Sequence, residues 1–89
     1  MSGPKWPGLG KLIEEAGEVA TAGAKLIVNH GRAEYWGNED AVYNLENEIA
    51  DVLAASAFVI EHNGLDNLRI LQRSQEKYQK YSQWKEDNE

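Results

Sequence analysis

Apolar residues recur at intervals of three and four over residues 9–29, which is the spacing of one face of an α-helix. Glutamates interrupt this stretch at Glu14, Glu15 and Glu18. On a helical wheel Glu15 lies at the edge of the apolar sector rather than on the opposite face. The sector itself consists of Leu12, Ile13, Ala16, Val19, Ala20, Gly23, Ala24, Leu26 and Ile27. The pattern therefore predicts an amphipathic helix that carries a carboxylate at the boundary of its buried face.

A second helix is predicted over residues 39–62, and its second half is apolar on nearly every side. From Ile49 to Ile60 the sequence reads IADVLAASAFVI, in which Asp51 and Ser56 are the polar residues. A helix of this kind is expected to be buried on most sides. Glu48 and Asp51 both lie among apolar positions on the wheel, and burying unpaired carboxylates is costly or forces them to take up protons. These two acids therefore need a partner.

A third amphipathic helix is predicted over residues 66–84, after a break at Asn63-Gly64 and with Asp66 as its N-cap. Its apolar positions become aromatic toward the C-terminal end, and residues 86–89 are expected to fray. Positive charge is supplied along it by Arg69, Arg73, Lys77 and Lys80. No repeat or strand pattern is found in the sequence. The predicted fold is all-α, with three helices per chain in an antiparallel bundle.

Two segments outside the helices contain tryptophans. Residues 1–8 hold both prolines and are expected to form an irregular arm, in which Trp6 packs either on a neighbouring segment or on a ligand. Residues 29–40 form a polar connection that contains Tyr35 and Trp36. These two rings either cover the edge of the core or form one wall of a pocket the size of a nucleobase.

Size and charge narrow the possible functions. The 89 residues predict a single domain over 1–89, whose modest core favours oligomerisation. A net charge of −6 argues against a nucleic-acid polymer or an anionic membrane as a partner, whereas a small anion could bind through a metal ion. The absence of cysteine excludes disulfides and thiolate chemistry. With no transmembrane run and no signal-peptide core, a cytoplasmic protein is expected.

Two pairs of acids stand at i,i+3 spacing: Glu15 with Glu18, and Glu48 with Asp51. If their helices pack antiparallel, all four carboxylates can converge at one level of the interface. Oxygen donors without histidine suit a hard cation, Mg²⁺ or alternatively Mn²⁺. Di-iron bundles use Glu-x-x-His pairs, whereas an aspartate occupies the matching position here. His30 and His62 lie at the far ends of their helices and are expected to be capping or surface residues.

A solvated helix face is the simpler explanation of the first acid cluster taken alone, because acidic side chains favour exposed positions. It does not explain the second pair, which is embedded in an apolar run. The two pairs together therefore favour a metal site over a purely structural role.

The order of these motifs resembles that of the MazG-like all-α nucleoside triphosphate pyrophosphohydrolases. EEAGE, at residues 14–18, and EIAD, at 48–51, match the family's EExxE and ExxD, and a basic, aromatic third helix follows. The resemblance spans about residues 12–84 and is closest to the small single-domain forms of phages and prophages. It implies magnesium-dependent hydrolysis of a nucleoside triphosphate, with deoxynucleotides expected, to the monophosphate and pyrophosphate. It also implies a homodimer or homotetramer in which helices of two subunits complete the bundle.

The resemblance also implies roles for individual residues. The metal would be held by Glu15, Glu18, Glu48 and Asp51. Glu14 would be an outer acid or would help to orient water, so Glu14 and Glu15 are the candidate catalytic residues. Candidates for binding substrate are Lys77, Lys80 and Arg73 at the phosphates, together with Trp36 and Trp6. The three cations are equally compatible with an exposed face of the third helix.

Tyr78 departs from the family pattern, because an asparagine often follows the lysine on the third helix and would contact sugar or phosphate. Two rival functions follow from the residues. One is a non-catalytic helical interaction module whose acids bind a structural cation or a basic partner. The other is a related enzyme that acts on another phosphorylated small molecule.

Overall fold

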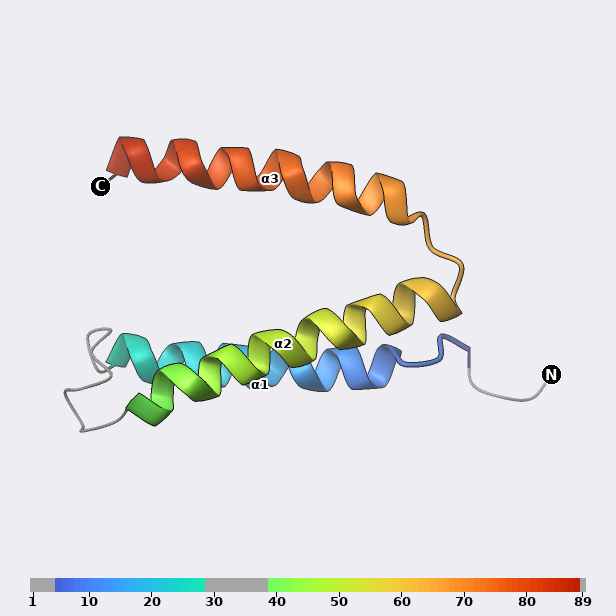
Figure 1. The fold of residues 1–89 in the computed structure, drawn as a ribbon, viewed down its shortest axis with the longest axis horizontal. Helices are drawn as coiled ribbons and strands as arrows, with labels where there is room; N and C mark the ends of the chain where they lie inside the picture. The colour runs from blue at the N-terminus through green and yellow to red at the C-terminus, as the bar shows by residue number, and fades with distance from the viewer. Residues whose placement is uncertain (1–4, 29–38, 89) are drawn as a thin grey trace.

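The computed structural model describes residues 5–28 and 39–88, which form three α-helices and no strand. These helices are α1 (Leu9–Val28), α2 (Glu39–His62) and α3 (Asn67–Asn88). Helices α1 and α2 pack against each other in opposite directions, and α3 turns back along the pair at a distance from it (Figure 1). The prediction of an all-α chain is confirmed. His30, Tyr35 and Trp36 lie outside the described residues.

Local capping explains where the helices end. Gly64 follows α2 with φ at 62°, a left-handed conformation that glycine adopts without strain, and α2 ends there as predicted. The Asp66 carboxylate accepts a hydrogen bond of 3.0 Å from the backbone N–H of Arg69, which caps α3. Helix α3 continues past Trp84, and the Asn88 side chain donates to the Trp84 carbonyl. The C-terminal end, expected to fray, is helical through Asn88.

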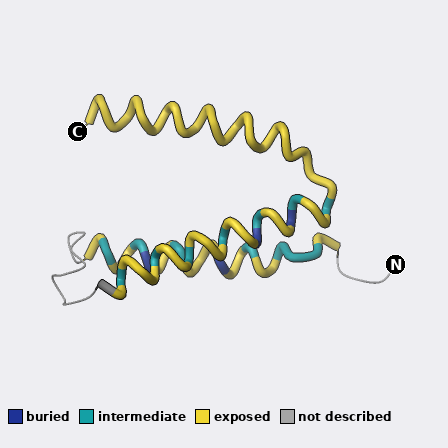
Figure 2. The backbone as a smooth tube through the Cα atoms, viewed as in Figure 1, coloured by how far each residue is buried: buried dark blue, intermediate teal, exposed yellow. Residues whose placement is uncertain are grey.

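The core of the described part lies between α1 and α2 and consists of small side chains. Ala22, Ala55 and Val59 are buried there, and Glu15 is buried with them (Figure 2). At the N-terminal end of α1, a Cβ atom on Gly8 would lie 2.6 Å from Cδ1 of Phe58. Small residues thus let the two helices approach closely, and they bring a glutamate into the interface.

The segment before α1 is fixed to the C-terminal end of α2. The side-chain amide of Asn63 donates to the Pro7 carbonyl at 3.0 Å and to the Val59 carbonyl at 2.8 Å. The backbone N–H of Leu9 donates to the Trp6 carbonyl at 3.0 Å. These bonds place the start of α1 over the last turns of α2. The residues just before α1 are irregular, as expected.

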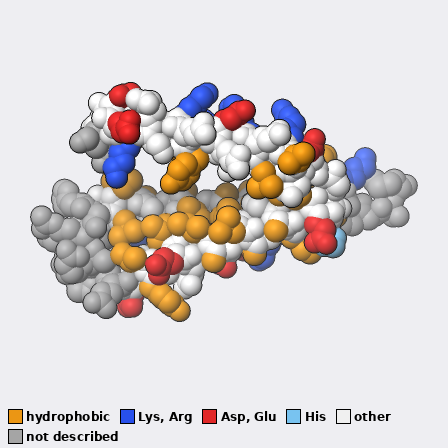
Figure 3. All heavy atoms as spheres, turned by 45° about the horizontal axis from the view of Figure 1, so that its top comes forward, with side chains coloured by type: hydrophobic (Ala, Val, Ile, Leu, Met, Phe, Trp, Pro, Cys, Tyr) orange, Lys and Arg blue, Asp and Glu red, His pale blue; other side chains and the backbone are white. Residues whose placement is uncertain are grey.

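Within one chain α2 is covered on one side only. One chain alone does not provide the burial on most sides that the sequence of α2 predicts, because Leu53 and Ile49 remain 67% and 45% exposed. The reason is that α3, which has no buried residue, stands away from the hairpin. Figure 3 shows apolar side chains along the face of the hairpin that lies beneath α3. None of the described helices combines the length and the apolar character needed to span a bilayer.

Candidate functional site

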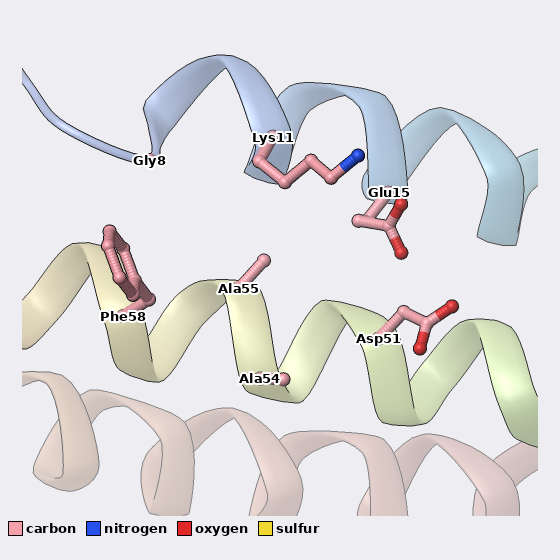
Figure 4. A pocket seen from close by; sticks show the side chains of 7 residues that line it. All are labelled: Gly8, Lys11, Glu15, Asp51, Ala54, Ala55 and Phe58. Carbon is pink, nitrogen blue, oxygen red and sulfur yellow. The ribbon is translucent and has the colours of Figure 1, made fainter.

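The predicted acids meet at the interface between α1 and α2. Glu15 on α1 is only 8% exposed, and its carboxylate points toward that of Asp51 on α2 (Figure 4). Antiparallel packing explains this arrangement, because residues near the N-terminal end of α1 then face the second half of α2. Both side chains line one cavity of about 510 Å³, which we call the apolar cavity. It is lined by Gly8, Lys11, Glu15, Asp51, Ala54, Ala55 and Phe58.

The other member of each acid pair lines a neighbouring hollow. Glu18 and Glu48 border a space of about 280 Å³, which we call the polar hollow. Its remaining lining residues are Thr21, Ala22, Lys25 and Asn44. The Oε2 atom of Glu48 is buried and has no hydrogen-bond partner among the described residues. A buried oxygen of this kind lacks the partner that its desolvation requires.

The pKa values of two of these acids, Glu15 and Glu48, are raised. Burial first, and then the charges of Glu18 and Asp51, raise the pKa of Glu15 above its ordinary value. The pKa of Glu48 rises from 4.5 to about 7 because it can share a proton with Glu18 and is partly desolvated. The nearby charges of Asp51 and Glu15 raise it further. A cation among the carboxylates would oppose both pKa shifts, because it favours the charged form of each acid.

The donor set fits a hard divalent cation. Carboxylate oxygens of Glu14, Glu15 and Glu18 on α1 lie within 4.8 Å of one another. Across the interface, α2 adds Asp51 beside Glu15 and Glu48 beside Glu18. All of these donors are oxygens, which Mg²⁺ and Mn²⁺ prefer. The orphaned oxygen of Glu48 is the kind of group that a bound cation would satisfy.

The sequence reasoning missed Lys11, a cation within the acidic site. Its Nζ atom lies 3.1 Å from Oε1 of Glu14, and its side chain lines the apolar cavity beside Glu15 (Figure 4). The hydrogen bond to Glu14, and then the charge of Glu14, raise the pKa of Lys11. The spacing was visible in the sequence, since Lys11 precedes Glu14 by three residues and Glu15 by four on the same helix. Glu14 is thus directed to a lysine, and it is half-exposed.

Phe58 was also missed as a site residue. It follows Asp51 by seven residues, which is two helical turns on the same face of α2. Its ring stacks on that of His62 with centroids 4.0 Å apart. His62 therefore packs on an aromatic ring at the surface, away from the acids, as its place at the helix end suggested.

The predicted substrate-binding residues are not brought to the acids within one chain. On α3, Arg73 lies 3.9 Å from Glu76, and the ammonium of Lys77 lies over the Tyr81 ring, 5.6 Å from its centroid. Lys80 is exposed on the same helix. Trp6, 53% exposed, precedes α1, and Trp36 lies outside the described residues. Their proposed roles remain predictions.

A family model described as the MazG nucleotide pyrophosphohydrolase domain matches residues 9–84. The chain belongs to the MazG family. The match spans most of the 89 residues and includes both acid pairs and nearly all of α3. Comparisons with curated proteins and with solved structures gave no significant match. Membership of the MazG family indicates a hydrolase that acts on nucleotides, and it confirms the resemblance found in the sequence.

Proposed function

We propose that this protein hydrolyses nucleoside triphosphates to the monophosphate and pyrophosphate, with deoxynucleoside triphosphates as the expected substrates. The reaction takes place at the acids between α1 and α2 and depends on Mg²⁺, for which Mn²⁺ can substitute. One observation carries the proposal: carboxylates of opposite helices face each other, Glu15 toward Asp51, within a chain of the MazG family. Such an arrangement costs stability unless it serves to bind a cation.

In this proposal Glu15, Glu18, Glu48 and Asp51 hold the magnesium. When bound, the metal supplies charge neutralisation for the triphosphate and helps to position it. The chain itself contributes donors from two rigid helices, so the carboxylates keep their places when the ligand arrives.

The chemistry proposed is an in-line displacement at the α-phosphorus. The oxygen of a water molecule forms a bond to phosphorus while the bond from phosphorus to the bridging oxygen breaks. Pyrophosphate leaves with the electron pair of that bond. Glu14 and Glu15 are the candidates to orient the water and to accept its proton, since both belong to the carboxylate group within 4.8 Å.

A second copy of the chain is proposed to complete the bundle as a homodimer or homotetramer. The support is the exposed apolar face of α2, with Leu53 at 67% exposure, and the absence of buried residues on α3. In such an assembly the basic residues of a neighbouring α3 could approach the acids. Arg73, Lys77 and Lys80 would then contact the phosphates.

The test is pyrophosphate release across the common ribonucleoside and deoxyribonucleoside triphosphates, with Mg²⁺ and with EDTA. Asp51→Asn should reduce turnover by at least about 100-fold, since the loss of even an indirect metal contact costs up to that amount. Glu46→Gln is the matched control, because Glu46 is an exposed acid of the same helix. If the parent protein turns over no nucleotide, the interaction module replaces the enzyme as the better explanation.

A further inference from the structure

We infer that the substrate binds along the α1–α2 interface in a single orientation. Its nucleoside occupies the apolar cavity, and its departing pyrophosphate lies in the polar hollow against Lys25 and Asn44. This inference rests on the proposed function, because it assigns a place to each product of that reaction.

The two spaces follow each other along the α1–α2 interface, and two of the four acids line each of them. The apolar cavity contains Glu15 and Asp51, whereas the polar hollow contains Glu18 and Glu48. Each space thus holds one carboxylate of α1 and one of α2. A helix rises 1.5 Å per residue, so Glu15 and Glu18 are roughly 4.5 Å apart along the axis of α1. A triphosphate held at these acids is long enough to extend into both spaces.

The lining of the apolar cavity suits a nucleoside. Ala54, Ala55 and Phe58 form its apolar wall, and its volume of about 510 Å³ is in the range of small-molecule sites. A nucleobase presents flat faces that stack on an aromatic ring. The Phe58 ring lines the cavity and stacks on His62, and its remaining exposed surface, 46% of the residue, is available for such a contact. Lys11 stands at the end of the cavity nearest the acids, where the α-phosphate would lie.

The lining of the polar hollow suits pyrophosphate. The Lys25 ammonium and the Asn44 side-chain amide both carry N–H donors, which phosphate oxygens accept. The Cα–Cβ bond of Lys25 tilts toward the N-terminus of α1, and so toward Glu18. The Thr21 hydroxyl already donates to the Gly17 carbonyl at 3.1 Å, which leaves Lys25 and Asn44 as the principal donors.

Lys25 has one competing explanation. It lies in the last turn of α1, where a cation is favoured by the helix dipole. Lys85 occupies the equivalent place in the last turn of α3, far along the chain from the acids. Comparing Lys25 with Lys85 therefore separates a contact with pyrophosphate from an effect on the helix end.

The proposed orientation is tested by measuring the binding of each product separately. Calorimetry in the presence of Mg²⁺ would measure the binding of inorganic pyrophosphate. A separate titration would measure the binding of the monophosphate that corresponds to the fastest-hydrolysed triphosphate. Lys25→Ala should weaken pyrophosphate binding about tenfold, because a hydrogen bond to a charged group is lost, and should leave monophosphate binding unchanged. Lys25→Arg should retain most of the pyrophosphate binding of the parent protein. Ala54→Leu should narrow the apolar cavity and weaken monophosphate binding while leaving pyrophosphate binding unchanged.

Two control variants and the melting temperatures show whether the effects are specific to the two spaces. Lys85→Ala should change the binding of neither product. Ala24→Leu should also leave both unchanged, because it enlarges an exposed alanine of α1 that lines neither space. Retained melting temperatures show that each variant folds. The proposed orientation is wrong if Lys25→Ala weakens the binding of both products equally. It is also wrong if Lys85→Ala weakens pyrophosphate binding as much as Lys25→Ala does. It is also wrong if Ala54→Leu leaves monophosphate binding intact, as when a partner subunit's side chain fills the cavity. If only the orientation is wrong, the parent protein still hydrolyses nucleotides. If the proposed function is wrong, the parent protein hydrolyses none.

Discussion

The carboxylate of Glu15 faces that of Asp51 across the α1–α2 interface, with Glu15 buried and Asp51 exposed. Two like charges in this position oppose the packing of the helices that bring them together. Lys11 partly offsets the charge on Glu15, but its ammonium is paired with Glu14. The site is therefore electrostatically incomplete without a cation, and this relationship underlies the predictions that follow.

Magnesium should stabilise the fold. Mg²⁺ bound between the helices favours the folded chain over the unfolded one, which cannot assemble four carboxylates from two segments. At a concentration 100 times the dissociation constant, the free energy of unfolding should rise by about 2.7 kcal/mol. Urea unfolding with MgCl₂ and with NaCl of matched ionic strength would measure this rise. Glu48→Gln should remove most of it, and an equal rise in the two salts would contradict a specific site.

The titration of Glu48 should make the metal-free protein sensitive to pH. Its pKa is about 7 in the folded chain against an ordinary value of 4.5, so the folded state binds the proton more tightly. The associated stability is fully present below pH 4.5 and is lost as the pH rises through about 7. Unfolding measured in EDTA across this interval should show the parent losing stability relative to Glu48→Gln. Parallel pH profiles for the two proteins would show that the hydrogen bond with Glu18 and the burial do not raise the pKa of Glu48 as the structure indicates.

The helices and their acid pairs could be predicted from the sequence because both are local patterns. Apolar spacing and the cap at Asp66 define helices without reference to the rest of the chain. Antiparallel packing then places Glu15 and Asp51 at corresponding levels, because Glu15 lies 13 residues before the end of α1 and Asp51 lies 12 residues after the start of α2. The facing of these two acids is thus a consequence of periodicity and topology.

The remaining features of the site depend on tertiary contacts. Nothing local indicates that Phe58 would be pressed against Gly8, because these residues meet only when the start of α1 lies over the end of α2. Lys11 was overlooked because it reads as one more surface lysine until the cavity beside it is seen. The covering of α2 also depends on tertiary contacts. The pattern shows that its apolar faces need covering, but not which helix or subunit would cover Leu53.

The exposed face of α2 should mediate self-association. Leu53→Glu would place a charge at the centre of this apolar surface, and burying an unpaired carboxylate there is costly. The variant should shift the protein toward smaller species in light scattering coupled to size-exclusion chromatography. Asn47→Glu adds the same charge at an exposed polar position of α2 and should leave the assembly intact. A parent protein that elutes as a monomer at all concentrations would rule out this interface.

The contact between Gly8 and Phe58 should be sensitive to a single methyl group. Gly8 has φ at 86°, and a Cβ atom there would lie 2.6 Å from the Phe58 ring, so Gly8→Ala strains both the backbone and the packing. The left-handed conformation alone costs about 1–2 kcal/mol for a residue other than glycine. Gly10→Ala is the matched control, because Gly10 lies in α1 with open space around its Cβ position and alanine favours a helix. Urea unfolding should therefore show Gly8→Ala destabilised and Gly10→Ala unchanged or stabilised. If both variants behave alike, the start of α1 does not lie against α2, and the apolar cavity that Gly8 and Phe58 line together would lose its wall.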